Sequence, residues 1–359
     1  MSNNAKYVDS NFNVEITANR DGLNFFDVRQ YPFQIYGLYD YKNQTPFKRM
    51  PDDIAINTNE GVATLYTNTS GGRIRFSTDS EVIVLSAEIA NIARYPHMSL
   101  TGACSFDIYE DFPDLGKSRY FSTFIPPYNV SDKFESRVYL PSRKKRYFTV
   151  HFPLYCDVKS VMIGISENST IDKGMMYKSF LPIVYYGNSV TQGGCASRPG
   201  NSYPNILGRR LNIDFINLGF SGAGRAEDIM AKYLSELDMS LFVCDYDHNA
   251  PTQQYLEDTH IKLYQRIRAS KPDLPIVIMS KCDFVYDAEN SIRRRDIIYE
   301  TFRYAKNMGD KNIYFLDGSS VYSGDNANIA VIDGVHPSDL GFSLIANMLE
   351  EIIARLINI

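Results

Sequence analysis

The chain has 359 residues and a net charge of −5, with 44% apolar and 22% charged residues. This length suits two domains with sizeable cores better than one small domain. The acidic balance argues against a nucleic-acid partner, because phosphates require a basic protein surface. No apolar run approaches the ~20 residues that cross a membrane, so we expect no membrane association.

The five cysteines are scattered, odd in number and without a Cys-x-x-Cys pair: Cys104, Cys156, Cys195, Cys244 and Cys282. This pattern favours reduced thiols over a disulfide framework. The first residues, Met1 to Lys6, also lack the apolar segment of a secretion signal. Together these observations predict a cytoplasmic protein.

Short segments rich in β-branched and aromatic residues, separated by turn residues, dominate residues 1–177. They predict an antiparallel β-sandwich with no helix interrupting it. The expected strands are Arg73–Ser77, Val82–Ser86, Phe106–Tyr109, Tyr120–Phe124, Tyr147–Phe152 and Val161–Ile165.

Residues 178–359 instead alternate apolar strand-like runs with helical patterns. This rhythm predicts a three-layer α/β/α domain around a parallel sheet. The expected strands are Leu181–Tyr186, Phe215–Leu218, Leu241–Cys244, Pro275–Met279 and Ile313–Leu316. The expected helices lie near 203–211, 226–237, 253–268, 289–307 and 342–356.

Four polar turns follow apolar segments in this second half. They are Gly187-Asn188-Ser189, Asn217-Leu218-Gly219, His248-Asn249-Ala250-Pro251 and Asp333-Gly334-Val335-His336. Because parallel sheets bind ligands at the carboxyl ends of their strands, the turns can all meet at one edge. The sequence therefore predicts a functional site there.

The residue types in these turns match nucleophilic catalysis. A serine hydroxyl needs a base within hydrogen-bond reach, and the base needs a carboxylate to fix its tautomer. Ser189 offers the hydroxyl, His336 the base and Asp333 the orienting acid. The amide of Asn249 and the backbone N–H groups of Gly219 and Ser189 can form an oxyanion hole.

Two other kinds of site are disfavoured by the same residues. The segment 187–194 lacks the Gly-Lys-Ser/Thr ending of a P-loop and the spacing of a dinucleotide site. Asp245, Asp247 and His248 crowd beside Asn249, but their spacing matches no metal-ligand motif. We therefore expect no cofactor and no metal.

Three further residues have alternative interpretations. Asp317, after the fifth strand, is a second candidate for the orienting acid, although it lacks the short link to His336. Arg198 can contact a substrate, but we expect it to form a structural ion pair instead. Cys195 lies close to Ser189 in the sequence and is expected to serve packing.

The four turns resemble the conserved blocks of SGNH/GDSL-family serine hydrolases. Further similarity to a bacterial branch of that family, in which a jelly-roll-like domain precedes the hydrolase, lies in 193–200, 217–222 and 245–251. Gly102 with Phe106-Asp107-Ile108-Tyr109 resembles the GxDLY-type motif of that branch. Two features depart from the family pattern: Asn188 replaces the middle residue of GDS, and the third block is not Gly-x-Asn-Asp.

The resemblance implies a serine esterase with Ser189, His336 and Asp333 as its triad and Ser189, Gly219 and Asn249 as its oxyanion donors. It also points to small acyl esters, chiefly acetyl esters of carbohydrates, as substrates. Two alternatives stay open: acyl transfer to an alcohol through the same triad, and a catalytically idle carbohydrate-binding protein. The oligomeric state does not follow from the sequence.

Overall fold

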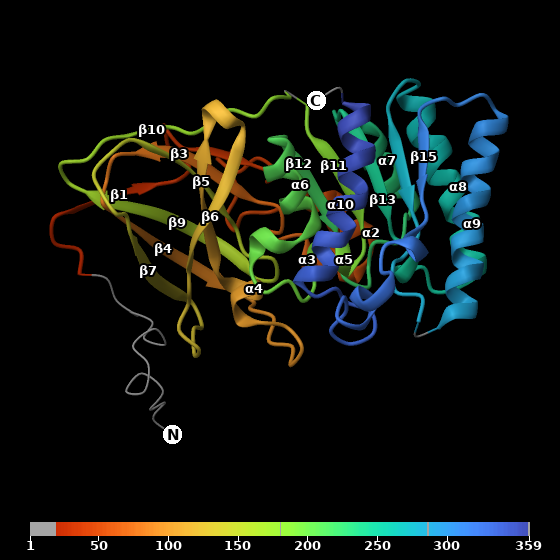
Figure 1. The fold of residues 1–359 in the computed structure, drawn as a ribbon, viewed down its shortest axis with the longest axis horizontal. Helices are drawn as coiled ribbons and strands as arrows, with labels where there is room; N and C mark the ends of the chain where they lie inside the picture. The colour runs from red at the N-terminus through yellow and green to blue at the C-terminus, as the bar shows by residue number, and fades with distance from the viewer. Residues whose placement is uncertain (1–18, 180, 286, 358–359) are drawn as a thin grey trace.

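The computed structural model describes residues 19–179, 181–285 and 287–357. Two antiparallel sheets form the N-terminal part, and a parallel sheet covered by helices forms the C-terminal part (Figure 1). No helix in these ranges is long and apolar enough to span a membrane.

The first antiparallel sheet has the order β1-β9-β4-β7. Its strands are β1 Leu23–Asp27, β9 Asp157–Ser166, β4 Val82–Ala90 and β7 Lys133–Tyr139. The second has the order β10-β3-β8-β5-β6, with β2 paired to β3. Its strands are β10 Ile171–Lys173, β3 Arg73–Thr78, β8 Arg146–His151, β5 Phe106–Phe112, β6 Lys117–Phe124 and β2 Gln34–Tyr36.

Alternating residues of both sheets bury one apolar core, as expected for a sandwich. Ile74 and Phe76 of β3 contribute to it from one sheet, and Ile83 and Leu85 of β4 from the other. All six predicted N-terminal strands are present. The prediction that no helix interrupts them is wrong, because α2 Asp52–Thr58, α3 Glu60–Leu65 and α4 Leu100–Cys104 lie between strands.

These helices are too short to carry a clear helical repeat, which is why pattern reading missed them. Their local signals are caps: the Asn59 side chain accepts from the N–H of Val62 at the start of α3, and that of Ser99 from Gly102 at the start of α4. The buried faces of α2 and α3 pack into the core of the C-terminal part through Ala55 and Val62.

The parallel sheet has the order β12-β11-β13-β14-β15. Its strands are β12 Phe215–Gly219, β11 Ile183–Gly187, β13 Leu241–Asp245, β14 Ile276–Met279 and β15 Ile313–Leu316. The helices that follow are α5 Ser189–Gln192, α6 Tyr203–Leu211, α7 Asp228–Glu236, α8 Gln253–Ser270, α9 Ala288–Asn307 and α10 Asp339–Leu356. Short 3-10 segments lie at Pro113–Leu115, Pro199–Asn201, Asp247–Asn249, Gly318–Ser320 and Gly324–Asn328.

Helices cover both faces of this sheet (Figure 1). One core packs α7, α8 and α9 against Val184 and Tyr186 of β11, and the other packs α6 and α10 against Ile183 and Tyr185. The α/β/α prediction is therefore confirmed. A boundary near residue 177 stays a prediction, and it falls between the last antiparallel strand and the first parallel one.

The register of the parallel sheet aligns the strand ends that matter. Gly187 of β11 lies opposite both Gly219 of β12 and Asp245 of β13. The turns that leave these strands therefore start side by side at one edge of the sheet.

Candidate active site

Ser189 begins α5, two residues after the end of β11. The buried side chain of Asn188 caps this helix: its Oδ1 accepts from the N–H of Val190 at 2.7 Å and from that of Thr191 at 3.4 Å. Its amide nitrogen donates to Asp245 Oδ1 at 3.3 Å. Asn188 therefore supplies the cap acceptor that an aspartate would supply, and the departure from GDS leaves the serine turn intact.

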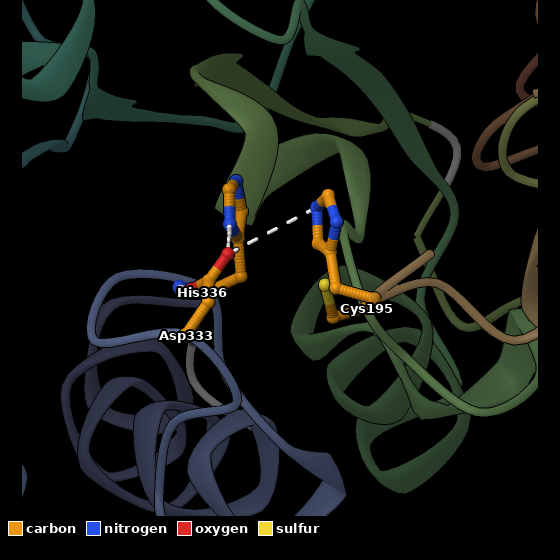
Figure 2. Close-up of side chains that lie close together, drawn as sticks. Cys195, Asp333 and His336 are labelled. Carbon is orange, nitrogen blue, oxygen red and sulfur yellow. Dashed lines mark hydrogen bonds and ion pairs between the residues drawn. The ribbon is translucent and has the colours of Figure 1, made fainter. Parts of the chain in front are cut away.

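A continuous hydrogen-bonded chain joins Ser189, His336 and Asp333. His336 Nε2 lies 2.9 Å from Ser189 Oγ, and His336 Nδ1 lies 2.7 Å from Asp333 Oδ2. Figure 2 shows the contact between Asp333 and His336. Because an ionised carboxylate only accepts, Nδ1 carries the proton and Nε2 is left to accept from the serine hydroxyl.

The Asp333 carboxyl is held ionised by its own turn. Its Oδ1 accepts from the backbone N–H groups of Val335, at 3.1 Å, and His336, at 2.8 Å. Partial burial raises the pKa of this carboxyl, but the hydrogen bonds from the backbone and imidazole of His336 and from Val335 outweigh it and lower the pKa to about 2. Asp333 is therefore negatively charged at any physiological pH.

Three predicted oxyanion donors must have a free N–H close to Ser189. In the described part of the chain the backbone N–H of Ser189 has no partner, while the Val190 and Thr191 N–H groups are bound to Asn188. The Asn249 amide uses one N–H to donate to the carbonyl of Phe220 at 2.9 Å, which leaves its second N–H available.

Gly219 does not meet this requirement, and that prediction is corrected. Its N–H donates to Asn217 Oδ1 at 2.9 Å, inside the turn. A Cβ at Gly219 would lie 2.3 Å from the backbone nitrogen of Gln192, so this glycine lies packed under α5. Its role is close packing of the strand end against the serine helix.

The glycine with a free N–H is Gly222, later in the same turn. The N–H groups of Phe220, Ser221, Ala223 and Gly224 all have acceptors, whereas that of Gly222 has none among the described residues. Gly222 has a φ of 67°, and a Cβ there would meet nothing within 4 Å, so the residue faces open space. The sequence analysis chose Gly219 as the donor and missed Gly222, although this second glycine lies only three residues later in the same turn.

Asp245, Asp247 and His248, which lie beside Asn249 in the sequence, each contact a different partner. Asp245 accepts from Thr191 Oγ1 at 3.1 Å, Asp247 accepts from the N–H of Lys281 at 2.9 Å, and His248 Nε2 lies 2.9 Å from Asp283. Burial, with the nearby charge of Asp247, raises the pKa of Asp245 to about 7. These side chains stabilise the strand end and its following turn.

Asp317 and Arg198 also lie apart from the serine. Asp317 accepts from the N–H and hydroxyl of Ser319, and Asp333 occupies the position beside His336. Arg198 forms a structural ion pair, as the sequence analysis favoured: its Nη1 lies 2.9 Å from Asp107 Oδ2.

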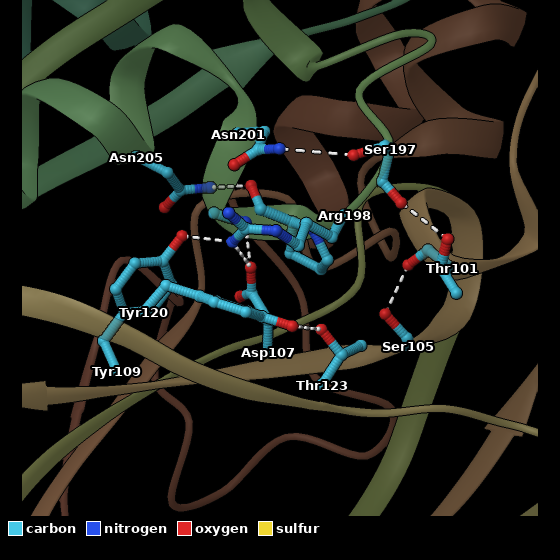
Figure 3. A network of polar contacts seen from close by, with 12 residues as sticks. Thr101, Ser105, Asp107, Tyr109, Tyr120, Thr123, Ser197, Arg198, Asn201 and Asn205 are labelled. Carbon is cyan, nitrogen blue, oxygen red and sulfur yellow. Dashed lines mark hydrogen bonds and ion pairs between the residues drawn. The ribbon is translucent and has the colours of Figure 1, made fainter. Parts of the chain in front are cut away.

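The Arg198–Asp107 pair joins the sandwich to the catalytic part (Figure 3). Asp107 of β5 is fully buried and also accepts from the N–H of Gly200 at 2.9 Å, and the Tyr109 hydroxyl contacts the same guanidinium. Gly102 packs directly on the same loop, since a Cβ there would lie 2.0 Å from the carbonyl oxygen of Ala196. The motif around Asp107 thus fixes the loop that follows the serine helix.

A cleft of about 520 Å³ opens beside His336. Both parts of the chain line it: Glu60, Gly61, Thr64, Leu65, Tyr95, His97, Met98, Tyr155, Ser221 and His336. The Tyr95 side chain is 54% exposed, and the Tyr155 hydroxyl bonds to Ser221 Oγ at 2.6 Å. The N-terminal part therefore supplies one wall of the site, which the sequence did not reveal.

These features define a serine hydrolase-type site at the carboxyl edge of a three-layer α/β/α domain. Residues 181–354 match the GDSL-like Lipase/Acylhydrolase family, and residues 23–171 match GxDLY, the N-terminus of SGNH-hydrolase-type esterases. The chain thus combines an N-terminal GxDLY domain with a GDSL-like lipase/acylhydrolase domain. No curated protein matches the chain.

Solved structures show the same two-part architecture. A GDSL-like lipase from Bacteroides ovatus is 26% identical with a TM-score of 0.84, over 94% of this chain and 98% of that one. A salicylyl-acyltransferase from a tetracycline biosynthetic pathway is 18% identical with a TM-score of 0.74, over 94% and 98%. An acetyl xylan esterase from the rumen bacterium Butyrivibrio proteoclasticus is 11% identical with a TM-score of 0.57, over 94% and 99%. The two lower identities bear on the fold alone.

Proposed function

We propose that this protein is a serine esterase that removes small acyl groups, chiefly acetyl, from carbohydrates. The observation that carries the proposal is the chain from Ser189 Oγ through His336 to Asp333, with contacts of 2.9 and 2.7 Å. Its geometry is that of a nucleophile, its base and the acid that orients the base.

The reaction follows from these contacts. Ser189 Oγ attacks the ester carbonyl carbon while its proton passes to His336 Nε2, and Asp333 stabilises the resulting imidazolium. His336 then returns the proton to the leaving alcohol. Water, activated by the same base, attacks the acyl-enzyme and releases the acid.

The oxyanion formed in each step is assigned to three donors: the N–H of Ser189, the N–H of Gly222 and the free amide N–H of Asn249. Each is a hydrogen-bond donor without another described partner, which is what a developing negative charge requires. Losing one such donor typically costs about 2.7–4 kcal/mol in the barrier.

The residues that line the cleft favour a carbohydrate as the substrate. Tyr95 exposes an aromatic ring beside His336, and sugar faces stack on such rings. The architecture shared with an acetyl xylan esterase is compatible with this choice. Acyl transfer would use the same acyl-enzyme, and the shared fold of a salicylyl-acyltransferase keeps it as the second candidate.

The nucleophile is tested with Ser189→Ala and p-nitrophenyl acetate. We expect the variant to lose hydrolysis and fluorophosphonate labelling, while Ser319→Ala, which removes a hydroxyl that donates to Asp317, keeps both. Full activity in Ser189→Ala would contradict the mechanism.

The substrate is tested with acetylated xylo-, manno- and chito-oligosaccharides, each assayed for released acetate. Tyr95→Ala should raise KM for these glycans and leave p-nitrophenyl acetate unaffected. Tyr128→Ala is the matched control, because this tyrosine is 87% exposed and lies outside the lining of the cleft. No acetate from any glycan would refute the substrate class, and acetyl appearing on an added alcohol would favour transfer.

A further inference from the structure

Four side chains that can bind a metal converge at the edge of the triad. His97, Cys195, Asp333 and His336 each offer one ligand atom, and these atoms all lie within 4.8 Å of one another. Figure 2 shows Cys195, Asp333 and His336 facing a common space. Neither Cys195 nor His97 has a part in the serine mechanism.

His97 comes from the sandwich and reaches the triad across the cleft. Its Nε2 lies 3.9 Å from Asp333 Oδ2, and its ring centroid lies 5.6 Å from that of His336. Within the described residues its ring nitrogens make no closer polar contact. A nitrogen lone pair of His97 is therefore free to bind a cation.

The segments carrying His97 and Cys195 are fastened to each other. Ser99 Oγ donates to the carbonyl of Ser197 at 3.0 Å, and Thr101 Oγ1 donates to the same oxygen at 2.6 Å (Figure 3 labels Thr101 and Ser197). The N–H of Ser197 donates to Asp339 at 2.9 Å, at the start of α10. Both ligand-bearing segments thus have fixed positions before any metal arrives.

The ligand set indicates the metal. Two imidazoles, a thiolate and a carboxylate form the mixed N/S/O set typical of four-coordinate Zn²⁺, with bonds of about 2.0–2.3 Å. A tetrahedron of that size has edges of roughly 3.3–3.8 Å, so the most distant pair must approach by about 1 Å. The 36% exposed side chain of His97 can make that movement.

We propose that His97, Cys195, Asp333 and His336 form an inhibitory zinc site. The Cys195 thiol loses its proton to solvent on binding, and the thiolate, the two imidazoles and the carboxylate bind Zn²⁺. A metal on His336 Nε2 removes the base directly. A metal on Nδ1 displaces the bond to Asp333 and leaves the imidazole proton on Nε2, so this nitrogen cannot accept from Ser189.

Binding is tested with Co²⁺ as a spectroscopic probe, independently of activity. We expect the folded protein to show tetrahedral cobalt bands and a thiolate-to-cobalt charge-transfer band, and excess Zn²⁺ to abolish both. Cys195→Ser should lose the charge-transfer band. Cys282→Ser is the matched control, since its thiol is similarly buried (9% against 8% exposed) and lies outside the four-residue group; it should retain the band.

Inhibition is tested with Zn²⁺ and p-nitrophenyl acetate, each variant being compared with its own rate in chelator. Chelator should restore the wild-type rate. His97→Ala and Cys195→Ser should each need at least about tenfold more Zn²⁺ for half-inhibition. Removing a side chain that merely hydrogen-bonds to a metal ligand already weakens metal binding by about 10–100-fold, and removing a ligand itself should weaken it at least as much. Mg²⁺ and Ca²⁺, which prefer oxygen ligands, should not inhibit.

The zinc site would be refuted if the wild-type protein showed no charge-transfer band, or if Cys195→Ser kept the band. It would also be refuted if the wild type, His97→Ala and Cys195→Ser were equally sensitive to Zn²⁺. An inactive protein that still shows the cobalt band would refute the esterase proposal and leave the metal site standing.

Discussion

Replacing Asp333 by Asn tests whether the carboxylate acts by fixing the tautomer of His336. The Asn Oδ1 can keep the two backbone hydrogen bonds, from Val335 at 3.1 Å and His336 at 2.8 Å, so the turn should persist. The amide NH₂, however, would face His336 Nδ1 at the position of the present 2.7 Å contact. A donor there makes Nδ1 an acceptor and places the proton on Nε2, which can then no longer take the Ser189 proton.

The expected loss in kcat is about 10⁴-fold, or about 5.5 kcal/mol in the barrier, with little change in KM. The assay is p-nitrophenyl acetate hydrolysis at neutral pH, with thermal unfolding measured in parallel. A folded Asp333→Asn protein that keeps kcat within about tenfold of wild type would refute the tautomer argument.

The same substitution has a signature in acid stability. The folded-state pKa of Asp333 is about 2, below its ordinary value of 3.8, so its contribution is present above pH 3.8 and is lost as the pH falls toward 2. Nearly two pKa units correspond to about 2.4 kcal/mol, reduced to roughly 1–2 kcal/mol because the side chain is 32% exposed. Asp333→Asn should remove this part of the acid dependence of the unfolding free energy.

Three further substitutions test the surroundings of the serine. Asn249→Ala should lower kcat by about 10²–10³-fold with KM nearly unchanged, as measured by steady-state kinetics, because it removes an oxyanion donor; an unchanged kcat would exclude that role. Arg49→Met should lower the unfolding free energy by about 2–4 kcal/mol, because it removes the buried guanidinium that donates to the carbonyls of Asn217, Gly219 and Leu65. Exposed Arg303→Met is its control in thermal unfolding, and equal effects of the two would contradict the assignment. Asp107→Ala should destabilise the protein by about 3–5 kcal/mol and expose the 193–201 loop to limited proteolysis, since it leaves Arg198 without its buried partner. Its control is Glu300→Gln, which breaks the exposed ion pair with Arg303 and should change the unfolding free energy by less than about 1 kcal/mol. A similarly small change for Asp107→Ala would show that the Asp107–Arg198 pair contributes little.

Periodicity located the regular elements well and the short ones poorly. The strands and helices of 181–356 appear close to their expected places because each is a long apolar run or stripe whose burial on the sheet decides its conformation. Helices α2, α3 and α4 have five to seven residues and depend on caps and distant contacts. Pattern reading therefore passed over them, although Ala55 and Val62 complete the core of the C-terminal part.

The available chemistry can be read from the amino-acid sequence alone, which has a serine after one strand, a histidine with an aspartate three residues earlier, and strands whose ends meet at one sheet edge. Those features are local; parallel-sheet register aligns the turns after β11, β12 and β13, whereas Asp333 and His336 lie in the turn before α10. Tertiary contacts select the backbone N–H groups that stay free: that of Gly219 donates to Asn217 Oδ1, whereas that of Gly222 has no acceptor among the described residues. The tertiary structure also places Tyr95 and His97, far away in sequence, in the wall of the cleft beside His336, since docking of the sandwich through Asp107 and Arg198 depends on contacts that no local pattern encodes.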